Sequence, residues 1–349
     1  MTAASIKTPD EKLAALIKPP LVRSTRLQFA RDDTLVVCAG FEDRGLAALK
    51  MMDRDNSCRL LAINYVPFER KNRVTEIAEY YQQVTGLSPE FIVYDRENPA
   101  GFGAEFVEIL GNRQGRMYVD VSAMSRLLIV QIIVALGIRN GGLSNCSIVY
   151  TEAAEYPPSQ EEAQAAFKKT ADDSTFNALF LSSGVFDVTI VPELSSVALA
   201  AIQTRLIVFP AFDAHHLTSL RSELQPSRYT FIEGAPPSAA NVWRRDFIAA
   251  INHLGEIGDA ESVVTSTLDY AQTLDCLLDL YRQHALRERL LLAPTGSKMQ
   301  SVAVGLFRAF VRDVQIVYPT PQGFVSPENY TKGCGSTYSL SLDSFSTLS

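Results

Sequence analysis

The chain has 349 residues and a formal net charge of −7, with 32 Lys and Arg against 39 Asp and Glu. Its hydrophobic share of 47% and charged share of 20% are typical of a globular protein and exclude a mostly disordered or fibrous chain. The length suits two domains of ordinary size. The negative charge argues against a broad surface for duplex nucleic acid, although a local basic pocket for a small anion remains compatible with it.

The cysteines and the N-terminal sequence indicate the compartment. The five cysteines are scattered and include no Cys-x-x-Cys pair, so we expect buried, reduced thiols. The N-terminus lacks a basic region followed by an apolar core, and the chain has no apolar run of about 18 residues. We therefore predict a cytoplasmic protein that neither spans nor contacts a membrane.

The first compact unit is predicted at residues 30–156, after an N-terminal arm of residues 1–29. Apolar runs that suit buried parallel strands alternate there with helical patterns, and strict alternation favours a mostly parallel sheet with helices on both faces. The expected elements are strands at 33–41, 60–65, 91–94, 117–121 and 147–150, and helices from about 44 and at 74–84, 102–110 and 127–138.

A second unit is predicted at residues 204–322, after a connector with extra elements at 157–203. Its expected elements are strands at 205–209, 229–233, 262–267, 289–293 and 314–318, and helices at 216–224, 241–254, 270–284 and 299–310. The predicted fold class is α/β, with two tandem Rossmann-like domains whose mostly parallel sheets are flanked by helices. A Gly-rich tail, 323–349, could place Tyr330 and Tyr338 over the second crevice as an aromatic platform.

The second unit repeats the first at an offset of about 170 residues. The matched landmarks at the ends of equivalent strands are Phe41 with Phe212, Glu42 with Asp213, and Arg126 with Lys298. Any two α/β domains share the alternation of elements, but shared polar residues at a nearly constant spacing favour duplication. We therefore expect two halves related by a pseudo-two-fold axis.

The loops after the fourth strands are the best candidates for a ligand site. These loops carry Thr295, Gly296, Ser297 and Lys298 in the second half, and Ser122, Ser125 and Arg126 in the first. Hydroxyls and a cation before a helix N-terminus suit a phosphate, and the glycine lets the backbone approach it. The alternative is that the hydroxyls only cap the helices and the cations point to solvent.

Ligands of open parallel sheets bind beyond the carboxyl ends of the strands, so we expect both loops to open onto one shared cavity. Phe41, Glu42, Phe212 and Asp213 follow the first strands and are expected near its mouth. Arg244-Arg245 begins a helix, where a cation opposes the dipole; this favours an anionic partner, with a solvated charged face as the alternative.

Commoner catalytic motifs are absent from the sequence. It contains no G-x-x-x-x-G-K-[ST], G-x-G-x-x-G or G-x-S-x-G motif, which disfavours P-loop enzymes, classical dehydrogenases and serine hydrolases. The four histidines have no metal-ligand spacing, and His215-His216 is interpreted as an exposed turn, with a crevice-facing pair as the alternative. We expect neither a metal nor a cofactor.

The second half resembles a CARF domain, the CRISPR-associated Rossmann-fold sensor. The resemblance rests on residues 290–299 (LLLAPTGSKM), which are similar to the family's strand-terminal Thr-Gly-Gly-Thr-Lys loop and precede a helix and a strand ending at Tyr318. This chain has Ser297 where the family loop commonly has Thr, and it lacks the second glycine. Two such units in one chain also resemble the SAVED sensor domains of bacterial antiphage systems.

CARF domains bind cyclic oligonucleotides across a two-fold axis and SAVED domains do so within one chain. The resemblance therefore implies a sensor that binds a nucleotide or cyclic oligonucleotide second messenger between the halves and, lacking room for an effector domain, signals to a partner effector protein in antiphage defence. One alternative is a metal-independent phosphodiesterase similar to a ring nuclease, in which Lys298 stabilises the transferring phosphate. Another is a non-catalytic protein-interaction component, so whether the chain is an enzyme stays open.

Overall fold

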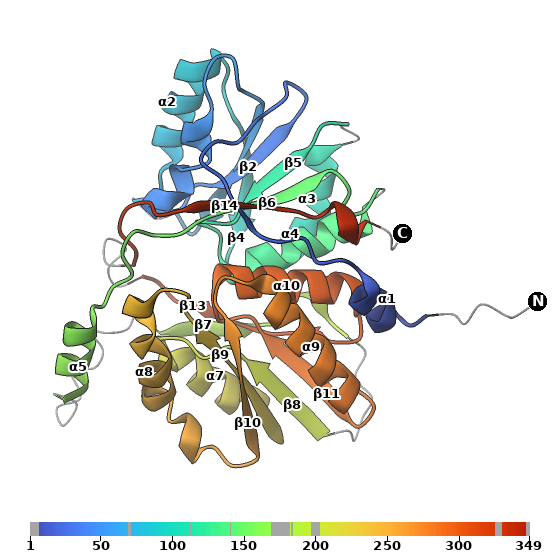
Figure 1. Ribbon diagram of the computed structural model, residues 1–349, viewed down its shortest axis with the longest axis vertical. Helices are drawn as coiled ribbons and strands as arrows, with labels where there is room; N and C mark the ends of the chain where they lie inside the picture. Colours follow the sequence, from blue (N-terminus) through green and yellow to red (C-terminus); the bar gives the residue numbers. More distant parts are fainter. Residues whose placement is uncertain are drawn as a thin grey trace, which may run out of the picture.

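The computed structural model describes residues 7–68, 71–111, 114–139, 141–168, 182, 184–196, 203–324 and 330–346. Two largely parallel β-sheets lie one above the other with helices between and around them (Figure 1). This arrangement confirms the predicted α/β class with two Rossmann-like sheets.

The first sheet has seven strands in the order β1-β14-β6-β5-β2-β3-β4. Its parallel strands are β2 (Thr34–Cys38), β3 (Arg59–Val66), β4 (Glu90–Asp95), β5 (Met117–Asp120) and β6 (Cys146–Thr151). The C-terminal strand β14 (Thr337–Ser341) pairs antiparallel with β6, and the short β1 (Val22–Arg23) pairs antiparallel with β14. Tyr338 thus lies in the first sheet and not over the second crevice.

The second sheet repeats the strand order of the first. It runs β10-β9-β8-β11-β12, and its strands, all parallel, are β8 (Gln203–Val208), β9 (Arg228–Ala235), β10 (Ala260–Ser266), β11 (Glu288–Ala293) and β12 (Gln315–Ile316). In both sheets the first and fourth strands of the Rossmann-like unit are neighbours, β2 beside β5 and β8 beside β11. The order reverses there, so each sheet has its switch point at the end of these strands.

The strand expected at 314–318 is divided in the structure. β12 stays in the sheet, whereas β13 (Tyr318–Pro321) turns away and pairs antiparallel with β7 (Val185–Thr189). Val317 still donates to the carbonyl of Leu292, but Pro319 lacks the N–H for the next hydrogen bond of the ladder, which explains why the parallel pairing ends there. The helix expected from residue 44 is likewise replaced by two short 3-10 helices, η1 (Asp43–Leu46) and η2 (Leu49–Met51), and Arg44 of η1 is buried in an ion pair with Glu42.

The helices form three layers around the two sheets (Figure 1). The outer layers are α2 (Val74–Thr85) on the first sheet and α7 (Ala214–Leu224) with α8 (Trp243–Ile251) on the second, and the layer between the sheets is α3 (Phe102–Leu110), α4 (Arg126–Ile138), α10 (Lys298–Phe310) and α9 (Tyr270–His284). The N-terminal α1 (Pro9–Ala15) packs on α9 and α10, and α5 (Gln160–Lys168) stands apart on the left of Figure 1. None of the helices within the described residues is long and apolar enough to cross a membrane.

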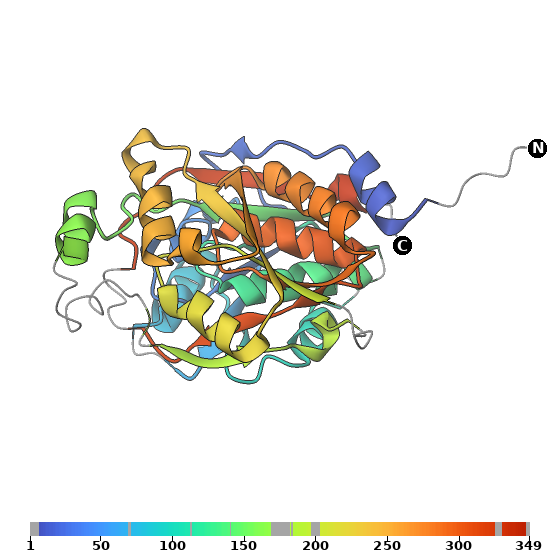
Figure 2. The same cartoon turned by 90° about the horizontal axis from the view of Figure 1, so that it is seen from below.

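Helices α4 and α10 lie side by side at the centre of the molecule (Figure 2). A Cβ on Gly305 would lie 3.0 Å from Cβ of Ile133, and a Cβ on Gly137 would lie 3.1 Å from Cβ of Ala309. Residues 133 and 305, like 137 and 309, are 172 positions apart, so each residue packs against its own counterpart in the repeat. Contacts of this kind require a pseudo-two-fold axis that runs between the two helices along their length.

Candidate functional site

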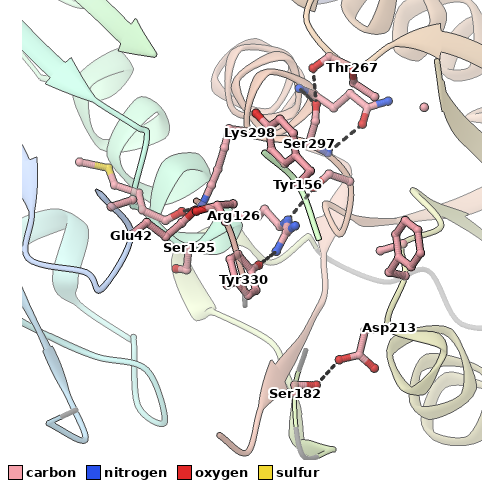
Figure 3. Close-up of a pocket in the computed structure, with 18 of the residues that line it drawn as sticks. Glu42, Ser125, Arg126, Tyr156, Ser182, Asp213, Thr267, Ser297, Lys298 and Tyr330 are labelled. Atoms are coloured by element: carbon pink, nitrogen blue, oxygen red, sulfur yellow. Dashed lines mark hydrogen bonds and ion pairs between the residues drawn. The ribbon is translucent and has the colours of Figure 1, made fainter. Parts of the chain in front are cut away.

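A cavity of about 320 Å³ lies between the two halves, beyond the carboxyl ends of their strands (Figure 3). Residues from both switch points line it, so the two crevices of the repeat open onto one space. Among the residues that the sequence singled out, the cavity is lined by Phe41, Glu42, Ser125, Arg126, Phe212, Asp213, Gly296, Ser297 and Lys298.

Ser122 and Thr295 lie behind the cavity wall. The Ser122 hydroxyl donates to Asp120 and accepts from the N–H of Thr151 at 2.8 Å. The Thr295 hydroxyl donates to the carbonyl of Phe209 at 2.6 Å. Because both side chains are buried and hydrogen-bonded within the fold, they fasten the two loops to the neighbouring strands.

Ser125 and Ser297 are the N-caps of α4 and α10. Ser125 Oγ accepts from the N–H of Leu128 at 3.3 Å, and Ser297 Oγ accepts from the N–H of Gln300 at 3.1 Å. The capping role considered for these hydroxyls is therefore present in both halves. The helices begin at the cavity, so the positive ends of two neighbouring macrodipoles point into it.

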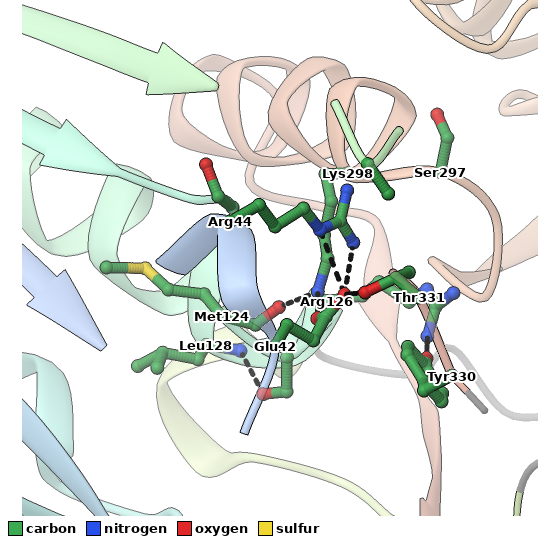
Figure 4. A network of polar contacts seen from close by, with 12 residues as sticks. Glu42, Arg44, Met124, Arg126, Leu128, Ser297, Lys298, Tyr330 and Thr331 are labelled. Carbon is green, nitrogen blue, oxygen red and sulfur yellow. Dashed lines mark hydrogen bonds and ion pairs between the residues drawn. The ribbon is translucent and has the colours of Figure 1, made fainter. Parts of the chain in front are cut away.

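Arg126 and Lys298, the first residues of these helices, each reach across the pseudo-two-fold axis. Arg126 Nε donates to the carbonyl of Gly296 at 2.6 Å, and Lys298 Nζ donates to the carbonyl of Met124 (Figure 4). Residues 126 and 298, like residues 124 and 296, are 172 positions apart in the repeat. The two hydrogen bonds are therefore equivalent contacts, one made by each half. Both cations therefore hold the halves together as well as lining the cavity.

Glu42 is the centre of a buried ionic network at the first-half wall (Figure 4). Its carboxylate lies 2.7 Å from Arg44 Nη2 and 3.7 Å from Lys298 Nζ, and it accepts a hydrogen bond from the Thr331 hydroxyl at 2.8 Å. Burial acts to raise the pKa of Glu42, but Arg44 and Lys298 outweigh it and hold that pKa below its ordinary value. For Lys298, burial outweighs the attraction of Glu42 and lowers the pKa to about 7.

Two aromatic clusters belong to the two halves of the site. Phe41 packs against Phe324 and Tyr330, with ring centroids 5.0 and 5.6 Å away. The second cluster joins Phe212 to Trp243 and Phe247 at 6.0 and 5.6 Å, with the Arg244 guanidinium 5.0 Å from the Phe212 centroid. The matched residues Phe41 and Phe212 thus each place an aromatic ring in the cavity wall.

Asp213 and His216 form the polar wall on the second-half side. Asp213 caps α7, accepting from the N–H of His215 at 3.3 Å, and its other oxygen accepts from the Ser182 hydroxyl (Figure 3). His216 Nε2 lies 3.7 Å from the Asp213 carboxylate. The expectation that His215-His216 forms an exposed turn is wrong for His216, because α7 begins earlier than expected and turns this side chain inward.

The charge of the cavity wall differs from that of the whole chain. Among the described residues, six cations and four acids line it, namely Arg44, Arg96, Arg126, Arg244, Arg245 and Lys298 against Glu42, Glu152, Asp213 and Glu233. The chain as a whole has more acids than cations. The cavity wall thus has an excess of basic side chains in a chain whose net charge is negative. No group of three metal-ligating side chains occurs in the part of the chain that the structure describes.

Several of these residues could not be singled out from the sequence. Arg44 stands two positions after Glu42, and only its burial identifies it as part of the network. Thr331 reaches Glu42 from 289 positions away, and Phe324 reaches Phe41 from the same distant segment. Arg244 differs from these residues because its place at a helix start marks it in the sequence, whereas its partners, the carbonyls of Tyr156 and Pro158, have no such mark.

Comparisons with known proteins assign no family to the chain. No family model matches it, and no curated protein matches it. Matches among solved structures include the cytoplasmic domain of a prokaryotic cation chloride cotransporter, which is 10% identical with a TM-score of 0.23 over 86% of this chain and 98% of that one. A TM-score this low carries no argument about function.

Proposed function

We propose that the chain binds a nucleotide, or a cyclic oligonucleotide second messenger, in the cavity between its two halves. The observation that carries the proposal is that two equivalent loops, each ahead of a helix N-terminus, meet at a pseudo-two-fold axis and line one cavity. A ligand with several phosphates and flat bases matches this wall, which combines main-chain amides, cations and aromatic rings.

The favoured position for phosphate is on the axis, close to the starts of α4 and α10. Amides and helix dipoles from both halves would act on it there together with Arg126 and Lys298. Since Lys298 has a pKa of about 7, an incoming phosphate would favour its charged form, and binding at neutral pH would take up a proton. The CARF and SAVED resemblance of the 290–299 segment points to the same ligand class and to antiphage signalling through a partner protein.

A second candidate, a metal-independent phosphodiesterase, is favoured by one observation. Lys298 lines the cavity with a pKa of about 7, which lets it gain or lose a proton at neutral pH, as a general acid or base must. Analysis of the bound molecule after incubation separates a sensor, which returns its ligand intact, from an enzyme, which returns a cleaved product.

The test is a thermal-shift screen of inorganic phosphate, mononucleotides and cyclic di-, tri- and tetranucleotides, followed by calorimetry, because a ligand of the folded state raises the melting temperature. Arg245→Ala is a suitable variant, since this cavity-lining side chain pairs only with its neighbour Asp246 among the described contacts. Arg287→Ala, on an exposed side chain outside the cavity, is its control. We expect Arg245→Ala to bind the ligand more weakly than wild-type protein, and Arg287→Ala to bind it as tightly as wild-type protein. If none of the probes bound to wild-type protein, the proposal would be contradicted.

A further inference from the structure

His216 is a buried side chain whose hydrogen-bonding atoms are unused. It is 8% exposed, and neither Nδ1 nor Nε2 has a hydrogen-bond partner among the described residues. Burial lowers its pKa to about 4, so the ring is neutral at pH 7 and presents one N–H donor and one N acceptor. Leaving such a group unsatisfied is unfavourable, and buried polar groups of this kind need a specific explanation.

The surroundings of His216 define what can satisfy it. The cavity that the ring lines also has the apolar residues Pro210, Phe212 and Ile248 in its wall, and the charges that act on the ring include the Asp213 carboxylate and Arg126. The carboxylate 3.7 Å from Nε2 repels a phosphate, whereas it attracts an N–H or O–H donor. A flat, uncharged group with donors and acceptors along one edge meets all of these conditions.

The first-half counterpart of Asp213 has different partners. Glu42 is already engaged by Arg44, Thr331 and Lys298, so a ligand would have to displace an internal partner to reach it. The pseudo-symmetric cavity is therefore chemically asymmetric, with a carboxylate between two cations on one side and a carboxylate beside an unsatisfied imidazole on the other.

We propose that His216 and Asp213 form a recognition subsite for the hydrogen-bonding edge of a nucleobase, with Phe212 and Ile248 against its apolar surface. This subsite deepens the proposed function, because it assigns the base to the second half and leaves the phosphates to the axis. It selects a neutral heteroaromatic ring that offers both a donor and an acceptor, as each of the common bases does.

The test compares AMP, GMP, CMP and UMP with ribose 5-phosphate, which lacks the base, by calorimetry on the full chain. We expect wild-type protein to bind at least one nucleotide about tenfold more tightly than ribose 5-phosphate, and His216→Phe to lose this preference with ribose 5-phosphate affinity unchanged. His216→Gln keeps a hydrogen-bond donor and an acceptor, so it should retain part of the preference for the nucleotide over ribose 5-phosphate. His253→Asn, at an exposed histidine outside the cavity, should change nothing.

A second measurement distinguishes failure of the base subsite from failure of the proposed phosphate site. Nitrogen NMR of the His216 ring, with adenosine, guanosine, cytidine and uridine at millimolar concentration, should show a shift of Nδ1 or Nε2 that Arg245→Ala does not abolish. A shift with a nucleoside, together with failure of every phosphate probe, would support the subsite and refute the phosphate proposal. Unchanged ring signals with all four nucleosides, or an unaltered base preference in His216→Phe, would overturn the subsite.

The thermal stability of His216→Phe tests why the His216 ring has no hydrogen-bond partner within the fold. Replacing an unpartnered buried imidazole with an apolar ring of similar shape removes the cost of leaving it unsatisfied. His216→Phe should therefore melt at a higher temperature than wild-type protein while losing the base preference. A lower melting temperature would indicate that His216 serves the fold through an internal contact and would contradict a ligand-directed role.

Discussion

Arg126 and Lys298 reach across the pseudo-two-fold axis in opposite directions, each donating to the main-chain carbonyl two residues before the other. The pair lies at the N-termini of α4 and α10, where a cation is disfavoured by the helix dipole. Reciprocal hydrogen bonds to carbonyls offset that cost, and they fix the register of the two helices at the cavity. The stability of the interface and the electrostatics of the cavity therefore depend on the same two side chains.

Lys298→Ala is expected to destabilise the fold, although the sequence pattern alone presents Lys298 as a residue free to contact a ligand. The variant removes the hydrogen bond to Met124 and leaves a void at a side chain that is 7% exposed. A loss of about 1–3 kcal/mol in the free energy of unfolding follows from the unpaired carbonyl and the missing packing. Urea denaturation measures it, with Lys50→Ala on a half-exposed side chain as the control. Equal midpoints for both variants would show that the cross-axis hydrogen bond contributes nothing.

Lys298 should also give the protein a distinctive pH dependence above neutrality. Its pKa is about 7 in the folded state against 10.5 for an ordinary lysine, so between these values the unfolded chain holds a proton that the folded chain has released. The free energy of unfolding therefore rises with pH in this window, by at most about 1.4 kcal/mol per pH unit. Lys298→Met should show a smaller rise between pH 7.5 and 9.5 than wild-type protein or Lys50→Met. Parallel curves for all three proteins would mean that Lys298 is charged when folded.

Asp120 should have the opposite effect on the free energy of unfolding, at pH values below neutrality. Burial raises its pKa to about 7 from 3.8, against the hydrogen bonds from Ser122, so the folded chain holds a proton that the unfolded chain has lost. The free energy of unfolding contributed by this group therefore falls as pH rises from about 4 to 7. Asp120→Asn keeps an acceptor for Ser122 and should remove this part of the slope, whereas Asp55→Asn on an exposed side chain should not. An unchanged slope in Asp120→Asn would show that the carboxyl is ionised throughout.

Much of the α/β framework could be predicted because it is encoded locally. Apolar runs such as 35–38 and 290–293 identify buried parallel strands, and the helix after Arg126, which is apolar except for Gln131, identifies an element covered on every side. The β14 strand has no such signal, because Thr337–Ser341 alternates small polar residues with Tyr and Leu in a Gly-rich tail. Its partner β6 lies almost two hundred residues away, and only the tertiary fold brings the two together.

The cavity was predictable in position but not in its internal pairing. Strand ends and helix starts indicated Glu42, Arg126 and Lys298, because ligands bind where parallel strands end. The partners of these side chains include a threonine in the C-terminal segment and two main-chain carbonyls, and a carbonyl has no sequence signature. The burial of His216 depends in the same way on where α7 begins.

The pseudo-two-fold contact between α4 and α10 supplies the last prediction. Alanine normally stabilises a helix interior by about 1 kcal/mol relative to glycine. At Gly305 the added Cβ would lie 3.0 Å from both Cβ and Cδ1 of Ile133 on the facing helix, closer than packed side chains tolerate. Gly305→Ala should therefore lower the free energy of unfolding by about 1–3 kcal/mol despite the better helix former.

Gly255→Ala is the matched control, because a Cβ at Gly255 meets no atom within 4 Å. Ile133→Ala removes Cδ1 and Cγ2, two of the three atoms that crowd Gly305, so the double variant Gly305→Ala, Ile133→Ala should lose less than the sum of the single losses. Denaturant titration of the four proteins gives this coupling directly. Additive losses would mean that Ile133 and Gly305 do not meet, and the axis between the halves would then have to pass through a different helix face.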